Sequence, residues 1–249
     1  MSKISAIVLT KNEEKNIKKC INSIKFCDEI VLVDDYSTDK TLAIARRLKV
    51  KIYKRKLNKD FASQRNFGLS KAKYEWVFFI DADEIVPKKL ASEIKNKIRN
   101  SKYNGFYIKR VDNWLNKELK GGENGKVWLL RLARKGKGKW KRSVHETWKI
   151  RGDAGKMNNK LIHNSHKNVS EFVRHINFHA TIHASENRRE GKGSNFLIIF
   201  FYPIFKFLSN FVVKRGYVDG EHGFVAATIM SFHSFLSWSE QYYEENRTK

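Results

Sequence analysis

Three carboxylates follow an apolar run in the segment VFFIDADEIVP at residues 77–87. Asp81 and Asp83 are separated by one residue, so in an extended segment both side chains point to the same side of the chain. Together they would form an oxygen-rich cradle for Mg²⁺ or Mn²⁺, whose remaining ligands would come from substrate phosphates. The alternative interpretation is a solvated acidic turn after a buried strand.

Further polar residues follow two other apolar runs, at 4–10 and 29–35. They are Thr10, Asn12 and Glu13 after the first run, and Asp34 and Asp35 at the end of the second. In open α/β sheets the ligand lies beyond the carboxyl ends of the strands. We therefore expect these residues to converge with Asp81, Asp83 and Glu84 on one rim of a sheet.

The elements that must position these residues alternate through the first hundred residues. Apolar runs predict four strands, at 4–10, 29–35, 51–56 and 75–83. Apolar residues at helical spacing predict four helices, at 12–25, 37–48, 58–72 and 88–98. Asn12 is expected to begin the first helix, and Ser37 or Thr38 to cap the second. This alternation predicts an α/β fold whose mostly parallel sheet is covered on both faces.

Four short motifs resemble those of a known family. They are TKNEE at 10–14, VDDYSTDKT at 33–41, SQRN at 63–66 and DADE at 81–84. In this order and spacing they are similar to the family 2 glycosyltransferases of the Rossmann-like GT-A fold, and more narrowly to the lipopolysaccharide core glucosyltransferase subgroup. The resemblance is strong over residues 3–100 and looser from there to about residue 240.

The resemblance implies a nucleotide-sugar donor, with UDP as the nucleotide, and a divalent cation, Mg²⁺ or Mn²⁺. It assigns the donor site to Thr10, Asn12, Glu13, Asp34, Asp35, Gln64, Arg65, Asn66 and Asp81, and the metal to Asp83. Within that set, Asp81 would approach the ribose and the 64–66 segment would close the nucleotide pocket. Structural roles are the alternatives, because Thr10, Asn12 or Asp39 could cap a helix and Gln64 could be an exposed helix residue.

Sugar transfer with inversion needs a general base on the face of the sugar opposite the leaving group. The resemblance places this base after a second small sheet, where the segment RSVHETW at 142–148 offers Glu146. Relatives commonly have Asp preceded by Glu at this point, whereas this chain has His145 and Glu146. The two residues could instead form a structural pair.

Basic residues and histidines surround this segment. KVWLLRLARKGKGKWKRS at 126–143 predicts two strands around a Gly–Lys turn. Arg131 and Arg134 could contact a diphosphate or an anionic acceptor, or be solvated strand residues, and we favour the solvated interpretation for Arg134. His163 and His166 could provide a metal or phosphate ligand, or only polar lining; we assign His163 to the metal. No HExxH or cysteine-rich arrangement indicates zinc.

The last part of the chain is apolar. The segment at 196–213 carries only Lys206 as a charge, and the segment at 223–238 carries none. Interfacial or re-entrant membrane attachment, a buried core or homo-oligomer contact, and a true membrane span are the three alternatives. The phrase KRGYVDGEHGF between the segments resembles the tail of the lipopolysaccharide subgroup. We place the catalytic domain at 1–185 and a membrane-associating or oligomerising region at 186–249.

The charge balance favours an anionic partner. The chain has 50 Lys and Arg residues and only 26 Asp and Glu residues, which gives a net charge of +24. An anionic membrane surface and a lipid-linked or phosphorylated saccharide acceptor would both match it. The first residues lack a signal-peptide pattern, so we expect a cytoplasmic protein at the inner face of the membrane.

Two other function classes are the alternatives to glycosyl transfer, and this sequence lacks the motifs of both. A sugar nucleotidyltransferase would usually have a Gly-rich loop where TKNEE stands. A basic nucleic-acid-binding module would show an RRM, KH or zinc-finger signature, and none is present, so no nucleic-acid partner is expected.

Overall fold

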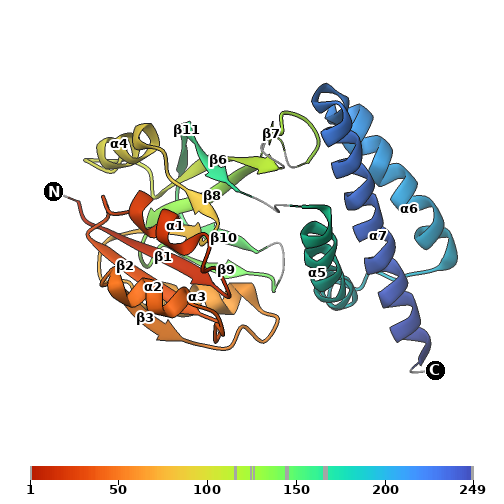
Figure 1. Cartoon of the computed structure of the whole chain (residues 1–249), viewed down its shortest axis with the longest axis horizontal. Helices are drawn as coiled ribbons and strands as arrows, with labels where there is room; N and C mark the ends of the chain where they lie inside the picture. The colour runs from red at the N-terminus through yellow and green to blue at the C-terminus, as the bar shows by residue number, and fades with distance from the viewer. Residues whose placement is uncertain are drawn as a thin grey trace. The chain divides into compact units, whose positions relative to one another are not determined.

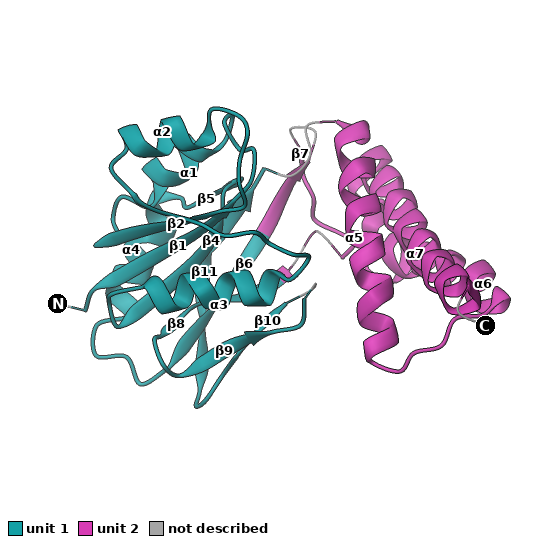
Figure 2. Ribbon diagram, turned by 90° about the horizontal axis from the view of Figure 1, so that it is seen from below, with its two compact units in different colours: residues 1–110, 128–164 teal, residues 111–127, 165–249 magenta. Residues whose placement is uncertain are grey.

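The computed structural model of the chain describes residues 2–114, 117–123, 125, 127–143, 146–164 and 168–247. The chain divides into two compact units, residues 1–110 with 128–164 and residues 111–127 with 165–249 (Figure 2). The predicted boundary between 185 and 186 differs from this division, because the helix at 169–189 packs with the helix at 221–247. The functions assigned to the two regions stay predictions.

Four parallel strands form one side of the main sheet of the first unit (Figure 1). They are β1 (Ile4–Thr10), β2 (Glu29–Asp34), β3 (Lys51–Lys54) and β4 (Trp76–Asp81), as the sequence predicts. β1 lies between β2 and β4, and β2 also pairs with β3, always in parallel. The α/β class is therefore confirmed.

The sheet continues past β4 with β8, which runs antiparallel to it. The remaining strands are β5 (Glu84–Ile85), β6 (Gly105–Trp114), β7 (Lys117–Glu118), β8 (Val127–Arg134), β9 (Gly138–Lys141), β10 (Thr147–Ile150) and β11 (Ala154–His163). Over the described residues the order is β3-β2-β1-β4-β8-β6-β11-β5, with β7 beside β6, and β9 pairs with β10 in a separate sheet. The two strands predicted around the Gly–Lys turn are thus β8 and β9, which enter different sheets.

The first three helices of the first unit start later than the sequence predicts, whereas the next one starts at Lys88, as predicted. These helices are α1 (Ile17–Ser23), α2 (Thr41–Arg47), α3 (Phe61–Lys71) and α4 (Lys88–Lys97). Asn12 does not begin α1, because its backbone is left-handed, with φ 54°, and its Oδ1 accepts from the Thr38 N–H at 2.8 Å. Ser37 and Thr38 do not cap α2; the Thr41 N–H donates to Asp39 Oδ1 at 2.9 Å.

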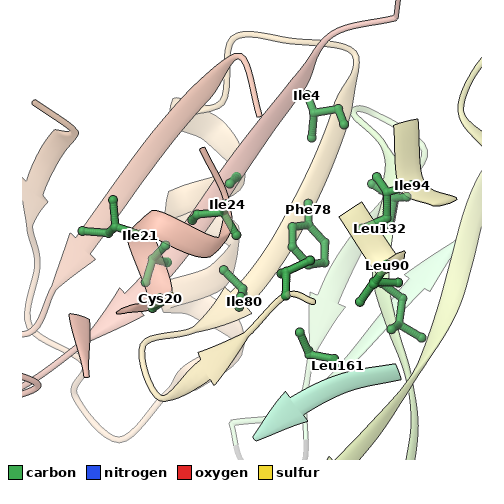
Figure 3. Close-up of a cluster of buried hydrophobic side chains, with 14 of the residues drawn as sticks. Ile4, Cys20, Ile21, Ile24, Phe78, Ile80, Leu90, Ile94, Leu132 and Leu161 are labelled. Atoms are coloured by element: carbon green, nitrogen blue, oxygen red, sulfur yellow. The ribbon is translucent and has the colours of Figure 1, made fainter. Parts of the chain in front are cut away.

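Two apolar clusters lie on opposite faces of the main sheet, because successive strand residues point to opposite sides. Phe78 and Ile80 belong to one cluster, and Val77 and Phe79 to the other. Figure 3 shows the first cluster, where strand residues meet side chains of α1 and α4; its labelled members are Ile4, Cys20, Ile21, Ile24, Phe78, Ile80, Leu90, Ile94, Leu132 and Leu161. The covering of both faces explains why these strands are apolar throughout.

Helix α3 lies very close to the sheet. A Cβ atom at Gly68 would be 2.6 Å from Ile7 Cγ2, so only glycine permits this approach. The N-cap of α3 is Asp60, whose side chain accepts from the Ser63 N–H at 2.8 Å. The close packing and the cap together fix the SQRN segment against the strand ends.

The second unit is helical. Its elements are α5 (Val169–Arg189), α6 (Phe196–Leu208), a π-helix (Ser209–Val213), a 3₁₀-helix (Gly216–Asp219) and α7 (Glu221–Arg247). Its core contains Trp114, Leu119, Phe172, Ile176, Ala226 and Ile229. The buried Asp219 carboxylate accepts from the backbone N–H groups of Lys120 and Gly121 at 2.9 and 2.8 Å. At Gly223 a Cβ atom would collide with the carbonyl oxygen of Gly216.

Helix α6 packs against α7 but buries none of its own residues. Its exposed apolar side chains include Phe196, Leu197, Phe200, Phe201, Ile204, Phe205 and Leu208. In the described part of the chain, Phe196–Val213 is the one helical segment long and apolar enough to cross a membrane, and only 6% of it is buried. The buried-core interpretation of this segment is therefore wrong for a single copy of the chain.

Candidate active site

The ends of three parallel strands place polar side chains at one edge of the sheet. Thr10 lies beside Asp34 in the β1–β2 register, and Leu9 lies beside Asp81 in the β1–β4 register. Because these strands end at the same edge, Thr10, Asp34 and Asp81 share one rim, as the sequence predicts. Asn12, Glu13 and Asp35 follow directly on the loops from that rim.

Hydrogen bonds tie the loops after β1 and β2 to each other. Asp35 forms an ion pair with Lys11 at 2.7 Å, and the carboxylate of Asp34 accepts from the backbone N–H and the hydroxyl of Ser37. The Asn12 N–H donates to the same Ser37 hydroxyl at 2.9 Å. The two predicted donor-site aspartates, Asp34 and Asp35, are therefore held in place by bonds within these two loops.

Thr10 and Glu13 differ in whether their side chains have hydrogen-bond partners in the described part of the chain. Thr10 Oγ1 is buried and has no hydrogen-bond partner among the described residues. The Glu13 carboxylate accepts from Asn16 Nδ2 at 2.8 Å, and its backbone N–H donates to Thr41 Oγ1 at 2.7 Å. Glu13 thus orders the turn before α1, whereas the Thr10 hydroxyl could bond to a ligand.

Two buried arginines share the carboxylate of Asp81. Oδ1 accepts from Arg65 Nη2 at 2.9 Å, and Oδ2 accepts from Arg131 Nη2 at 2.6 Å. Burial alone would raise the pKa of Asp81, but Arg131 and Arg65 outweigh it and hold the pKa well below its ordinary value. Asp81 is therefore ionised, with both oxygens engaged by the protein.

Arg131 is not a solvated strand residue. Its side chain is 4% exposed, and Nη2 also lies 3.1 Å from Glu84 Oε1. Glu84 is fully buried and its Oε2 accepts from the Asp81 N–H at 2.8 Å. Burial raises the pKa of Glu84. The interaction of Arg131 with Asp81 and Glu84 makes it an internal counter-ion of the DADE motif.

Arg134, at the end of the same strand, also differs from expectation. Its guanidinium lies 4.7 Å from the ring centroid of Trp76, and it forms an ion pair with Glu75. Its side chain is 22% exposed, so it is half-buried rather than solvated. This packing accounts for Arg134 without a ligand.

Asp83 and His163 lie together, although 80 residues separate them in the chain. The antiparallel pairing of β11 with β5 puts His163 opposite Glu84, and His163 Nε2 is 3.1 Å from Asp83 Oδ2. Burial would raise the pKa of Asp83, but His163 outweighs it and lowers the pKa. The structure thus brings the two predicted metal ligands together, whereas His166 lies outside the described residues.

The spacing of this pair is that of a hydrogen bond or ion pair, and it is also close to the spacing of two ligands on one divalent cation. Neighbouring ligands of an octahedral Mg²⁺ lie about 3 Å apart, close to the 3.1 Å between Asp83 Oδ2 and His163 Nε2. Over the described ranges no group of three or more acidic, His or Cys side chains could hold a metal, and Asp81 is occupied by arginines. The chain would supply two ligands, and a diphosphate and water the others.

Gln64 and Asn66, on α3, are engaged with the protein. Gln64 is 1% exposed; its Nε2 donates to the Arg55 carbonyl at 2.8 Å and its Oε1 accepts from Arg55 Nη1 at 2.9 Å. The exposed-helix interpretation of Gln64 is therefore wrong. Asn66 makes two bonds of 3.0 Å, to the backbone N–H and carbonyl of Trp140. These amides order the loops around the site.

Arg65 connects Asp81 with Glu146. Its Nε donates to Glu146 Oε1 at 2.7 Å, and the Glu146 side chain is 15% exposed. The predicted base thus lies one guanidinium away from the DADE motif. His145 lies outside the described residues, so the suggested His145–Glu146 pair is not described.

Sequence reasoning missed the internal role of Arg131. In β8 it stands between Leu130 and Leu132, which are both buried. A charged residue inside an apolar run indicates a buried partner of opposite charge, because an unpaired charge there would be very unfavourable. That signal was present in VWLLRLAR, but it does not say which carboxylate is the partner.

Known proteins resemble this chain along most of its length. Residues 5–149 match the family model described as glycosyl transferase family 2. An uncharacterized glycosyltransferase of Rickettsia felis is 30% identical over 250 residues, covering 95% of this chain and 88% of that protein. The lipopolysaccharide core biosynthesis glycosyltransferase LpsC of Rhizobium meliloti is 28% identical over 252 residues, covering 96% and 92%. The family match and the observed architecture confirm the expected GT-A fold class.

One solved structure aligns with almost the whole chain. It is that of residues 1–349 of S. aureus TarS, with 17% sequence identity and a TM-score of 0.49, covering 99% of this chain and 91% of that one.

Replacing Arg131 tests the ion cluster. Arg131→Gln should lower the free energy of unfolding by about 3–5 kcal/mol, because Asp81 and Glu84 lose a shared buried cation. Urea denaturation measures this. Arg47→Gln, at the exposed end of α2, is the matched control and should cost less than about 1 kcal/mol. Equal small losses in both variants would contradict the assigned role.

Proposed function

Because this chain belongs to glycosyl transferase family 2, it is a glycosyltransferase, and we propose that it is an inverting, metal-dependent enzyme. Its donor is a nucleotide-sugar, with UDP as the nucleotide, and its acceptor is a lipid-linked or phosphorylated saccharide. The family match decides the reaction class in favour of glycosyl transfer over nucleotidyl transfer and nucleic-acid binding.

The observation that carries the proposal is the proximity of a candidate base to the candidate cation site. Glu146 is linked through Arg65 to Asp81, which stands two residues before Asp83. A carboxylate base and a cation-binding carboxylate are the two protein groups that a metal-dependent inverting transfer uses. Both lie in the first unit, so this unit would contain the whole reaction centre.

Glu146 accepts the proton of the acceptor hydroxyl in this reaction. The hydroxyl oxygen forms a bond to the anomeric carbon, the bond from that carbon to the diphosphate oxygen breaks, and its electron pair leaves with the diphosphate. Attack from the face opposite the leaving group inverts the anomeric centre. Thr10, Asp34 and Asp35 line the donor side of the rim, where the unpartnered Thr10 hydroxyl would bond to the nucleotide.

Asp83 and His163 would hold Mg²⁺ or Mn²⁺. When bound, such a cation neutralises the negative charge that develops on the leaving diphosphate. Both oxygens of Asp81 accept hydrogen bonds from Arg65 and Arg131, and Glu84 also bonds to Arg131. Asp83 is therefore the carboxylate of the DADE motif that would bind the cation.

An acceptor carried on lipid agrees with the surface of the second unit. The outer face of α6 exposes phenylalanines such as Phe200 and Phe205, at 55% and 65%. Lys206, the one charge of the 196–213 segment, lies 2.6 Å from Glu123 Oε2 and is thereby neutralised. A face of this kind on a chain of net charge +24 suits the anionic inner leaflet of the cytoplasmic membrane. LpsC, named for lipopolysaccharide core biosynthesis, supports the same acceptor class.

Asp83→Asn tests the cation site. The variant should keep its melting temperature without ligand but lose the thermal stabilisation that UDP with Mn²⁺ gives, because the amide is a much weaker ligand than the carboxylate. Differential scanning fluorimetry with a panel of nucleotide-sugars, with and without Mn²⁺, measures this. Asp153→Asn, an exposed site in the same unit, should behave as wild type. Full transfer activity in excess chelator would refute metal dependence.

Glu146→Gln tests the base. Turnover should fall about 10²-fold or more, while the dissociation constant for UDP with Mn²⁺ stays near the wild-type value. Steady-state kinetics and calorimetry separate the two effects, and Glu240→Gln on the exposed face of α7 serves as the control. If UDP affinity collapses in a folded variant, Glu146 is a binding residue instead.

Phe200→Ser and Phe205→Ser test membrane attachment. A phenylalanine transferred to an apolar phase contributes about 2 kcal/mol, so each change should weaken binding to phosphatidylglycerol vesicles about 30-fold. Vesicle sedimentation measures this, with Tyr107→Ser in the first unit as the control, since Tyr107 is also an exposed aromatic residue. Unchanged sedimentation together with loss of a dimer in ultracentrifugation would favour the homo-oligomer contact.

A further inference from the structure

The loop that carries Glu146 is held in place from one helix. It connects β9 with β10, which pair antiparallel from Lys141 opposite Thr147. The first residue of α3 donates its N–H to the Ser143 carbonyl at 2.9 Å, Asn66 bonds to the Trp140 backbone, and Arg65 bonds to Glu146. Three points of the hairpin are therefore attached to α3 within about one and a half helical turns.

Of these attachments, the Arg65 contact is the one that reaches the reacting carboxylate. Nε donates to Glu146 Oε1 at 2.7 Å, while Nη2 donates to Asp81 Oδ1 at 2.9 Å. A guanidinium is planar and its donors are fixed relative to one another, so two carboxylates on one guanidinium have a defined separation and orientation. A lysine ammonium could not impose that geometry.

Arg65 is itself immobilised by packing. Its guanidinium lies 4.7 Å from the ring centroid of Trp140 and 5.8 Å from that of Phe79. Trp140 stacks on Trp148 at 5.5 Å and meets Phe79 edge-on at 5.0 Å. Since a side chain can orient another only if it is fixed itself, this aromatic cluster explains how Arg65 can define the place of Glu146.

We propose that Arg65 is a positioning residue for the general base, which it fixes relative to the donor-side carboxylate of Asp81, rather than a contact to the nucleotide. This inference rests on the proposed function of Glu146. It differs from the donor-site role that the family resemblance gave to Arg65, and it is supported by the bonds of the Nε and Nη2 donors to protein carboxylates.

The test compares Arg65→Gln, Glu146→Gln and the double variant in the full-length protein. UDP-glucose hydrolysis in the presence of Mn²⁺ reports turnover, and calorimetric titration with UDP and Mn²⁺ reports donor affinity. We expect Arg65→Gln to lower kcat about 10²-fold and to leave UDP affinity within about threefold. The double variant should be no slower than Glu146→Gln, because a positioning residue acts only through its partner.

Folding is controlled by Arg65→Lys and by Lys71→Gln, an exposed residue of the same helix. Arg65→Lys keeps a cation beside Asp81, so it should fold even if Arg65→Gln does not. It should lower kcat about tenfold, less than Arg65→Gln does, because the ammonium keeps the charge but not the fixed geometry of the guanidinium. Lys71→Gln should match wild type in every measurement.

Two results would overturn the inference. One is a loss of UDP affinity of tenfold or more in a folded Arg65 variant with kcat unchanged, since Arg65 Nη1 has no partner in the described part of the chain and could contact the donor. The other is an additive loss in the double variant. Absence of hydrolysis of any UDP-sugar by the wild-type chain would refute the proposed donor, whereas either result above would leave the proposed function intact.

Discussion

The sharing of one carboxylate, Asp81, between two buried guanidinium groups is the interaction on which the site depends. Arg65 and Arg131 are both buried and each has a second carboxylate partner, Glu146 or Glu84, but among the described residues Asp81 is the one carboxylate that contacts both of them. Asp81 and the two arginines come from β4, α3 and β8, so the ion cluster joins the parallel half of the sheet to the antiparallel half. The two aspartates of the DADE motif therefore have different partners. Asp81 bonds to the two arginines, whereas Asp83 pairs with His163.

The rim of the site could be predicted because it follows from local rules. Strands of a parallel sheet end at one edge, so Thr10, Asp34 and Asp81 had to meet once their runs were recognised as strands. The start of α1 could not be predicted in this way. Asn12 has a good capping side chain, but that side chain bonds to Thr38 in another loop, and sequence spacing does not reveal such a contact.

Contacts between strands that are distant in the sequence account for the other side-chain partners that the sequence did not predict. Arg131 meets Asp81 because β8 pairs antiparallel with β4, and His163 meets Asp83 because β11 pairs with the two-residue strand β5. Both pairings join segments about 50 and 80 residues apart, and a single sequence carries no signal for such register. Gln64 and Asn66 lie in a motif that the family resemblance recognised, yet their amides bond to Arg55 and Trp140. Recognition of the motif therefore does not predict which protein groups each of its side chains contacts.

The phrase KRGYVDGEHGF has a steric explanation. Asp219 uses its carboxylate to receive backbone N–H groups of the 120–121 segment, and Gly223 lies against the Gly216 carbonyl where no side chain has room. These two residues of the phrase are therefore requirements of how the helical unit folds. A substitution of Asp219 or Gly223 found in a genetic screen should accordingly be interpreted as an assembly defect.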